Sequence, residues 1–178
     1  GFVDPGLGRY RGMRLIVLPA LYTKHLETVS HTFLGAIHAM GQGFDAVLLC
    51  NAANAPFARI LQLGGTPVAL NVDGLERKRR KWGLAGRSYY RVCERLAARL
   101  PDALVTDAEV IRRYYRRAYG VASHMIVYGG DLEPPAGTDT LAALGLEPGA
   151  YVLYVSRFEP ENNPDRVVEA WRRVPGEL

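Results

Sequence analysis

Two carboxylates, Asp73 and Glu76, are the first candidates for chemistry in this sequence. They follow an apolar stretch over residues 67–72 and lie within a charge-dense segment that ends at Trp82. A carboxylate in such a loop can orient or deprotonate a hydroxyl group, or bind hydroxyls without reacting. Asp73 and Gly74 are also an ordinary turn pair, so a turn without any ligand is the alternative interpretation.

Two asparagines, Asn51 and Asn54, follow another apolar stretch over residues 46–50. Ligands of α/β proteins bind at the carboxyl ends of parallel strands, so both polar loops are expected to border the same cleft. An amide side chain offers a donor and an acceptor to a ligand that carries hydroxyls. Capping of the loop would explain the two asparagines equally well.

The run over residues 77–82 contains five cations and a tryptophan. Together with a formal net charge of +4, it suits an anionic partner such as nucleotide phosphates, lipid phosphates or nucleic acid. No helix-turn-helix, zinc or aromatic-strand pattern accompanies it, so we expect no nucleic-acid partner. A solvated loop without a ligand is the alternative. The histidines show no ligand-like grouping, which predicts no metal site.

The composition, 48% hydrophobic and 22% charged, is typical of a soluble globular protein. No apolar run approaches the roughly 20 residues that span a bilayer, and no positively charged start followed by an apolar stretch suggests a signal peptide. We therefore expect a cytoplasmic location. Cys50 and Cys93 lie in apolar surroundings and are expected to be buried free thiols.

Stretches with strand and helix periodicity alternate, which predicts an α/β fold: a Rossmann-like parallel sheet with flanking helices. The run 46–50 is continuously apolar, as in strands buried on both faces. Thr106 and Glu109 have the spacing of a capping box. The predicted strands are 13–18, 46–50, 67–72, 103–105, 124–128 and 151–155, and the predicted helices are 29–40, 56–63, 89–100, 106–119 and one beginning near 163.

Glycine and proline cluster between residues 129 and 149, which indicates a linker or domain boundary. We therefore expect an N-terminal domain over 1–131, a linker over 132–149 and the start of a second Rossmann-like domain over 150–178. One strand and one helix cannot bury a core, so the second domain is expected to continue beyond this sequence.

Five blocks together carry a family resemblance. They are HTFLGAIHA (31–39), LCNAANAP (49–56), NVDGLERKRRKW (71–82), TDAEVIRRYYRRAYG (106–120) and YVLYVSRFEPENNPD (151–165). In this order and at this spacing they resemble the bacterial family 4 glycosyltransferases. Within that family the resemblance is to the rhamnosyltransferase-like group that builds capsule, O-antigen and exopolysaccharide.

The resemblance implies a GT-B architecture, in which two Rossmann-like domains face each other across a cleft. The acceptor would bind the N-terminal domain and a nucleotide sugar the C-terminal one, with retention of the anomeric configuration and without a metal or other cofactor. The family's first strand and glycine-rich loop are missing before Gly1, and its pair of donor-binding glutamates would lie beyond Leu178. The sequence is therefore expected to be a fragment that is inactive alone.

The resemblance also implies roles for single residues. Arg157 matches the arginine that faces the donor diphosphate, and Asn162 stands where the family commonly has a lysine. The alternative for Arg157 is a surface arginine paired with Glu159 or Glu161. Asp73 and Glu76 would be the catalytic residues of the loop that borders the transfer site.

Acceptor binding would involve polar, basic and aromatic side chains of the same cleft rim. The partners implied are a nucleotide sugar, a saccharide or polyprenyl-diphosphate-linked acceptor, and the anionic face of a membrane. Two rival functions stay open, a non-catalytic nucleotide- or carbohydrate-binding module and a sugar-nucleotide epimerase of the same architecture. The predicted acceptor-binding residues are Asn51, Asn54, Gly74, Arg79, Lys81 and Trp82.

Overall fold

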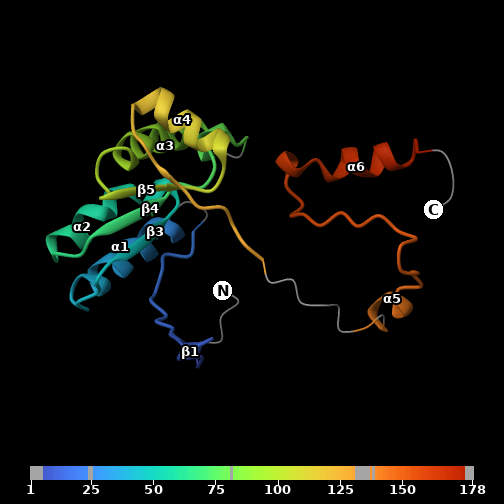
Figure 1. Ribbon diagram of the computed structural model, residues 1–178, viewed down its shortest axis with the longest axis horizontal. Helices are drawn as coiled ribbons and strands as arrows, with labels where there is room; N and C mark the ends of the chain where they lie inside the picture. The colour runs from blue at the N-terminus through green and yellow to red at the C-terminus, as the bar shows by residue number, and fades with distance from the viewer. Residues whose placement is uncertain (1–5, 24–25, 81, 131–136, 138, 175–178) are drawn as a thin grey trace. The chain divides into compact units, whose positions relative to one another are not determined.

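The computed structural model describes residues 6–23, 26–80, 82–130, 137 and 139–174. The chain divides into two compact units (Figure 1). The larger unit comprises residues 1–78 and 82–128, and the smaller one comprises 79–81 and 129–178.

The larger unit is built on a parallel sheet. Its strands lie in the order β3-β4-β5-β6, and each follows the previous one in the chain through a helical connection. This arrangement confirms the predicted α/β fold with a Rossmann-like parallel sheet. In-register leucines, Leu49, Leu70 and Leu104, form an apolar row across the β3–β4 and β4–β5 pairings. The strands are β3 (Val47–Cys50), β4 (Val68–Asn71), β5 (Ala103–Thr106) and β6 (His124–Met125).

Helices connect these strands, and in Figure 1 α3 and α4 lie together on one side of the β3–β5 ribbons while α1 and α2 lie near β3. Gly120, with φ 70°, ends α4 in the left-handed conformation that glycine adopts without strain. The helices are α1 (Glu27–Met40), the 3₁₀ turn η1 (Ala52–Phe57), α2 (Ala58–Leu63), η2 (Glu76–Lys78), α3 (Leu84–Ala97) and α4 (Glu109–Tyr119).

The core lies on one face of the sheet. Leu49, Leu70 and Leu104 pack there in one cluster with buried residues of the helices, Leu61 among them. Leu48, on the opposite face of β3, is 61% exposed. The prediction that 46–50 is buried on both faces is therefore wrong, because within the described residues the helices contribute to a single core. A continuous apolar run does not show by itself which faces are covered.

Four local predictions differ from the structure. Of the predicted strand 124–128, only His124–Met125 is a strand. Only part of 13–18 is a strand: β2 (Met13–Arg14) pairs antiparallel with β1 (Arg9–Tyr10), apart from the main sheet. The capping box is wrong, because helix α4 begins after Ala108 with no side-chain cap, and the Thr106 hydroxyl lies 3.1 Å from that of Ser123. Cys93 is buried as expected, whereas Cys50 is exposed.

The smaller unit contains only helical elements among its described residues. The stretch 151–155, predicted as a strand, has no strand pairing there, and an extended chain counts as a strand only when a neighbour completes its hydrogen bonds. In the helix predicted to begin near 163, the apolar side chains of Val167, Val168 and Trp171 are exposed. Part of the predicted linker, 132–136 and 138, lies outside the described residues. The elements are α5 (Asp139–Ala143), η3 (Pro160–Asn162) and α6 (Pro164–Trp171).

Candidate functional site

The loops that follow β3 and β4 begin side by side at the carboxyl edge of the sheet. The Asn51 backbone N–H donates to the Asn71 carbonyl at 2.8 Å, and the Val72 N–H donates to the Val105 carbonyl at 3.1 Å. These bonds extend the parallel ladder just past the strands. The parallel pairing thus brings Asn51 and Asp73 to the same edge, as the sequence predicts.

Both of these residues have a backbone conformation that side-chain-bearing residues rarely adopt. The φ angle is 75° at Asn51 and 55° at Asp73. Asparagine and aspartate tolerate positive φ better than most residues, yet such positions cost free energy. Residues with strained backbone conformations cluster at functional sites. Two neighbouring strand ends carry such residues here, so this edge of the sheet is the candidate site.

The loop after β3 is held by its own asparagines and by α3. The Asn51 Oδ1 accepts from the Ala53 N–H at 2.9 Å, and the Asn54 Nδ2 donates to the Cys50 carbonyl at 2.8 Å. From α3, the Tyr89 hydroxyl donates to the Ala53 carbonyl at 2.9 Å. Asn54 is 6% exposed, and its Oδ1 is buried without a hydrogen-bond partner among the described residues. Asn54 therefore shapes this loop.

Asp73 is placed differently, because its side chain is exposed. Its backbone N–H donates to the Asn71 Oδ1 at 3.4 Å, and the Asn71 Nδ2 donates to the Tyr128 hydroxyl at 3.1 Å. Within the described part of the chain, no ion pair or hydrogen bond involves the Asp73 carboxylate. Gly74, beside it, is half-buried. The Asp73 carboxylate is thus available to a ligand at the sheet edge.

Trp82 packs back onto α3. Its ring centroid lies 5.0 Å from that of Tyr90, and its Nε1 donates to the Glu76 Oε2 at 3.4 Å. Gly86 makes this packing possible, because a Cβ there would lie 2.8 Å from the Trp82 Cε3. Trp82 and Glu76 are both half-buried, whereas Asp73 is exposed. Of the two candidate carboxylates in the loop, Asp73 is therefore the exposed one.

This packing leads to a prediction for Gly86→Ala. Alanine normally stabilises a helix interior by about 1 kcal/mol relative to glycine. We expect that gain to be cancelled at Gly86, since the Trp82 indole must shift. The matched control is Gly35→Ala in α1, where a new Cβ meets nothing within 4 Å. Urea unfolding and the emission of Trp82, in a Trp171→Phe background, measure both effects; equal stabilisation by the two substitutions with unchanged emission would refute the prediction.

A buried carboxylate that the sequence analysis missed organises the basic loop. Glu94 in α3 is 2% exposed, and both its oxygens lie 3.0 Å from the Arg77 Nε. The hydroxyls of Tyr114 and Tyr119 in α4 donate to its Oε2 at 2.8 and 3.0 Å. The Arg77 Nη2 in turn donates to the Tyr114 hydroxyl at 2.7 Å. One carboxylate therefore ties η2, α3 and α4 together.

The protonation behaviour of this network follows from its contacts. The pKa of Arg77 is raised, chiefly by its hydrogen bond to Tyr114 and then by Glu94, so the guanidinium is charged at any working pH. Burial raises the pKa of Tyr119 and of Tyr115, which keeps both phenols neutral. Burial likewise raises the pKa of the Cys93 thiol, which argues against a nucleophilic role.

The predicted donor-side residues lie in the smaller unit. Arg157 is exposed, and its Nη1 lies 3.6 Å from the Glu159 Oε1, the pairing expected of a surface arginine. The Asn162 Nδ2 donates to the Arg157 carbonyl at 2.8 Å, so this amide holds its own loop. Arg79 also forms an ion pair with Glu159. Lys81 lies outside the described residues.

Among the described residues, no group of three or more His, Cys, Asp or Glu side chains could hold a metal ion. No helix in the described ranges is long and apolar enough to cross a bilayer.

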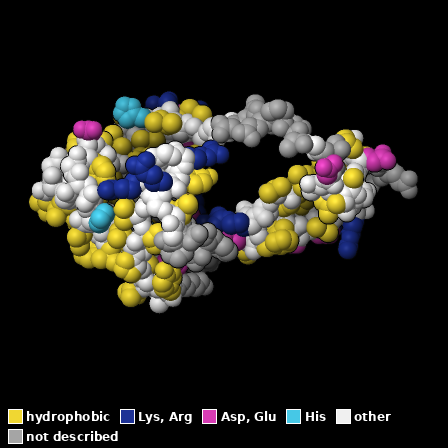
Figure 2. All heavy atoms as spheres, turned by 90° about the horizontal axis from the view of Figure 1, so that it is seen from below, with side chains coloured by type: hydrophobic (Ala, Val, Ile, Leu, Met, Phe, Trp, Pro, Cys, Tyr) yellow, Lys and Arg dark blue, Asp and Glu magenta, His cyan; other side chains and the backbone are white. Residues whose placement is uncertain are grey.

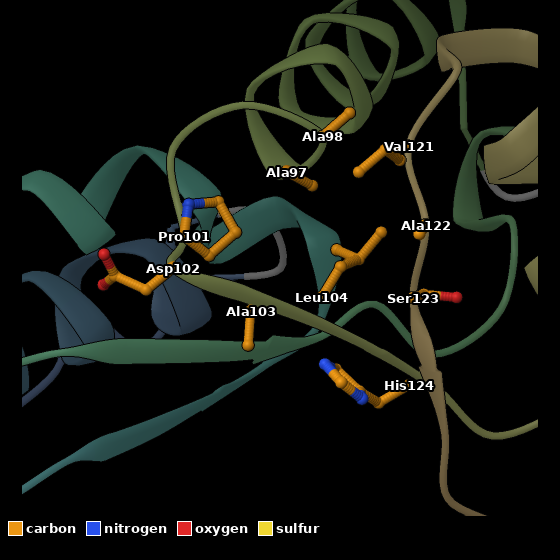
Figure 3. A pocket seen from close by; sticks show the side chains of 10 residues that line it. All are labelled: Ala97, Ala98, Pro101, Asp102, Ala103, Leu104, Val121, Ala122, Ser123 and His124. Carbon is orange, nitrogen blue, oxygen red and sulfur yellow. The ribbon is translucent and has the colours of Figure 1, made fainter.

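A cavity of about 180 Å³ lies at the opposite, amino edge of β5 and β6 (Figure 3). Its lining includes Asp102, Ser123 and His124, but Figure 3 shows the Asp102 carboxylate and the Ser123 hydroxyl pointing away from each other. Asp102 is already engaged, because its Oδ2 accepts from the Val68 N–H at 2.8 Å and from the Gln62 Nε2 at 3.0 Å. The carboxylate and the hydroxyl that line the cavity do not converge, so the cavity is a poor candidate for chemistry.

The fold defines an α/β protein with a Rossmann-like sheet, and the polar carboxyl edge past β3 and β4 is its candidate ligand site. Residues 47–131 match the family model described as a domain of unknown function (DUF1972). Domains of this family occur in glycosyltransferase-associated proteins, which gives the chain a coarse link to glycosyltransferases. No curated protein matches the chain.

Proposed function

We propose that the protein is a retaining glycosyltransferase that transfers a sugar from a nucleotide sugar to a saccharide or polyprenyl-diphosphate-linked acceptor in cell-surface polysaccharide synthesis. The observation that carries the proposal is that two features lie in the same region, residues 47–131. The region that matches the glycosyltransferase-linked domain is also the region whose sheet edge carries the strained, exposed Asp73. The resemblance of the five sequence blocks supports the same activity.

Asp73 is proposed to orient or deprotonate the acceptor hydroxyl. Its carboxylate has no partner in the described part of the chain, and a general base must reach the proton it removes. Asn51 and Gly74 are proposed to bind acceptor hydroxyls beside it. Glu76 would act through its contact with Trp82, which fixes the end of the loop.

Arg157 is proposed to compensate the charge that develops on the leaving diphosphate. A guanidinium can do this without a metal, because its planar donors match phosphate oxygens bidentately. Asn162 supports the proposal indirectly, since its amide donates to the Arg157 carbonyl and so positions that backbone. Binding would require Arg157 to exchange Glu159 for the phosphate, which costs little because the pair is exposed.

Hydrolysis and transfer by the full-length protein, assayed with a panel of nucleotide sugars, test this assignment. Arg157→Ala is expected to lower turnover by roughly 10²-fold, the usual effect of removing one transition-state donor. The matched control is Arg166→Ala on α6, an exposed arginine in the same unit, which should leave turnover unchanged. Unchanged turnover in Arg157→Ala would remove Arg157 from the site. Binding of nucleotide sugars without their consumption would indicate a binding module.

A further inference from the structure

Among the described residues, the side chains that line one concavity of the larger unit are all cations. Arg77, Lys78, Arg87 and Arg91 surround a cavity of about 300 Å³. Arg77 and Lys78 belong to η2. Arg87 and Arg91 lie four residues apart on α3, and residues at this spacing share one face of a helix. The space-filling view in Figure 2 shows Lys and Arg side chains gathered in groups on the larger unit, with few acidic side chains among them.

Within the described residues, three of the four charges of this cationic cleft have no ion-pair partner. Glu94 compensates Arg77 alone, through the two contacts at 3.0 Å. Within the described residues, no ion pair or hydrogen bond involves the side chains of Lys78, Arg87 or Arg91. Other arginines differ: Arg112 and Arg113 share Glu109 at 3.0 and 2.9 Å. Three uncompensated cations in one recess repel each other unless an anion binds between them.

The cleft is also partly preorganised. Arg77 is fixed by Glu94 and by the Tyr114 hydroxyl, and its guanidinium carbon lies 5.6 Å from the Tyr114 ring centroid. Such a held guanidinium loses little freedom when it binds a phosphate oxygen. The exposed Lys78, Arg87 and Arg91 can close on the ligand from two sides.

We infer that this cleft binds a diphosphate group. Two or three negative charges on one compact group match the three uncompensated cations, and arginines recognise phosphate oxygens bidentately. The assignment to the acceptor's diphosphate rests on the proposed function, whereas the binding of a diphosphate as such does not. In that role the cleft would hold the diphosphate of a lipid-linked acceptor at the end of the loop that begins with Asp73.

Isothermal titration of this chain with inorganic pyrophosphate and with geranyl diphosphate tests the inference, with geraniol as the uncharged control. The double variant Arg87→Gln, Arg91→Gln is expected to weaken pyrophosphate binding at least about 10-fold, because hydrogen bonds between charged groups are stronger than those between neutral groups. The matched control, Arg95→Gln with Arg99→Gln, removes equal charge from exposed positions outside the cleft and should keep the affinity.

Equal losses in both double variants would overturn the inference, since general positive charge would then explain the binding. So would an absence of pyrophosphate binding, or binding only to phosphatidylcholine vesicles that contain phosphatidylglycerol, which would indicate a membrane surface instead. The titration contains no sugar donor. A negative titration and a negative transfer assay are therefore independent results, and each can be told from the other. Diphosphate binding without any transfer activity would leave the cleft assigned and the proposed function refuted.

Discussion

Replacing Glu94 with alanine is expected to lower the free energy of unfolding of the chain by about 3–5 kcal/mol, the largest effect on stability that we predict. Glu94 is buried and accepts from Arg77, Tyr114 and Tyr119. Its removal would leave a half-buried guanidinium and two phenols without their acceptor. Glu94→Gln, which keeps the volume and part of the hydrogen bonding, should cost less than Glu94→Ala.

The matched control is Glu109→Ala. Glu109 also contacts two arginines, but on the surface of α4, where such pairs contribute about 0–1 kcal/mol. Urea unfolding followed by circular dichroism compares the two sites. Losses of similar size at Glu94 and Glu109 would mean that the buried network does not hold the basic loop to α3 and α4.

The second large effect concerns activity. Asp73→Asn in the full-length protein is expected to reduce transfer by about 10²–10⁴-fold, the range typical of removing a general base. Stability should change little, because asparagine also tolerates a φ of 55° and the Asp73 side chain is exposed. Steady-state transfer assays and thermal unfolding of the same preparation separate the two effects.

Asp73→Gly sharpens this test, because it removes the carboxylate and also relieves the positive φ. We expect a variant at least as stable as the natural protein and still inactive. The control is Asp45→Asn, an exposed carboxylate just before β3 at the opposite edge of the sheet, which should remain active. Natural activity in Asp73→Asn would show that Asp73 is only a turn residue.

Several elements of the larger unit could be predicted because local sequence and tertiary packing agree there. Most of the run 67–72 folds as β4 (Val68–Asn71), and the edge past it carries Asp73 as the parallel topology requires. The burial of 46–50 could not be predicted, because an apolar run does not reveal whether both faces of its sheet are covered.

Other features depend on contacts that periodicity does not contain. The stretch 151–155 has strand propensity, but a strand also needs a neighbour to pair with. Glu94 was missed because a glutamate in an arginine-rich helix suggests a solvated face. A usable signal was present, since Tyr90, Cys93, Glu94 and Ala97 have the i, i+3, i+4, i+7 spacing of a buried stripe.

The central claim is that the carboxyl edge past β3 and β4 is the acceptor side of a glycosyltransferase site. The most direct test is the transfer of sugar from a nucleotide sugar to a polyprenyl-diphosphate-linked acceptor by the full-length protein in the presence of a chelator, with product configuration read by NMR. We predict a product with retained anomeric configuration, formed without added metal and lost in Asp73→Asn. Absence of any product with every donor tested, or undiminished product from Asp73→Asn, would contradict the claim.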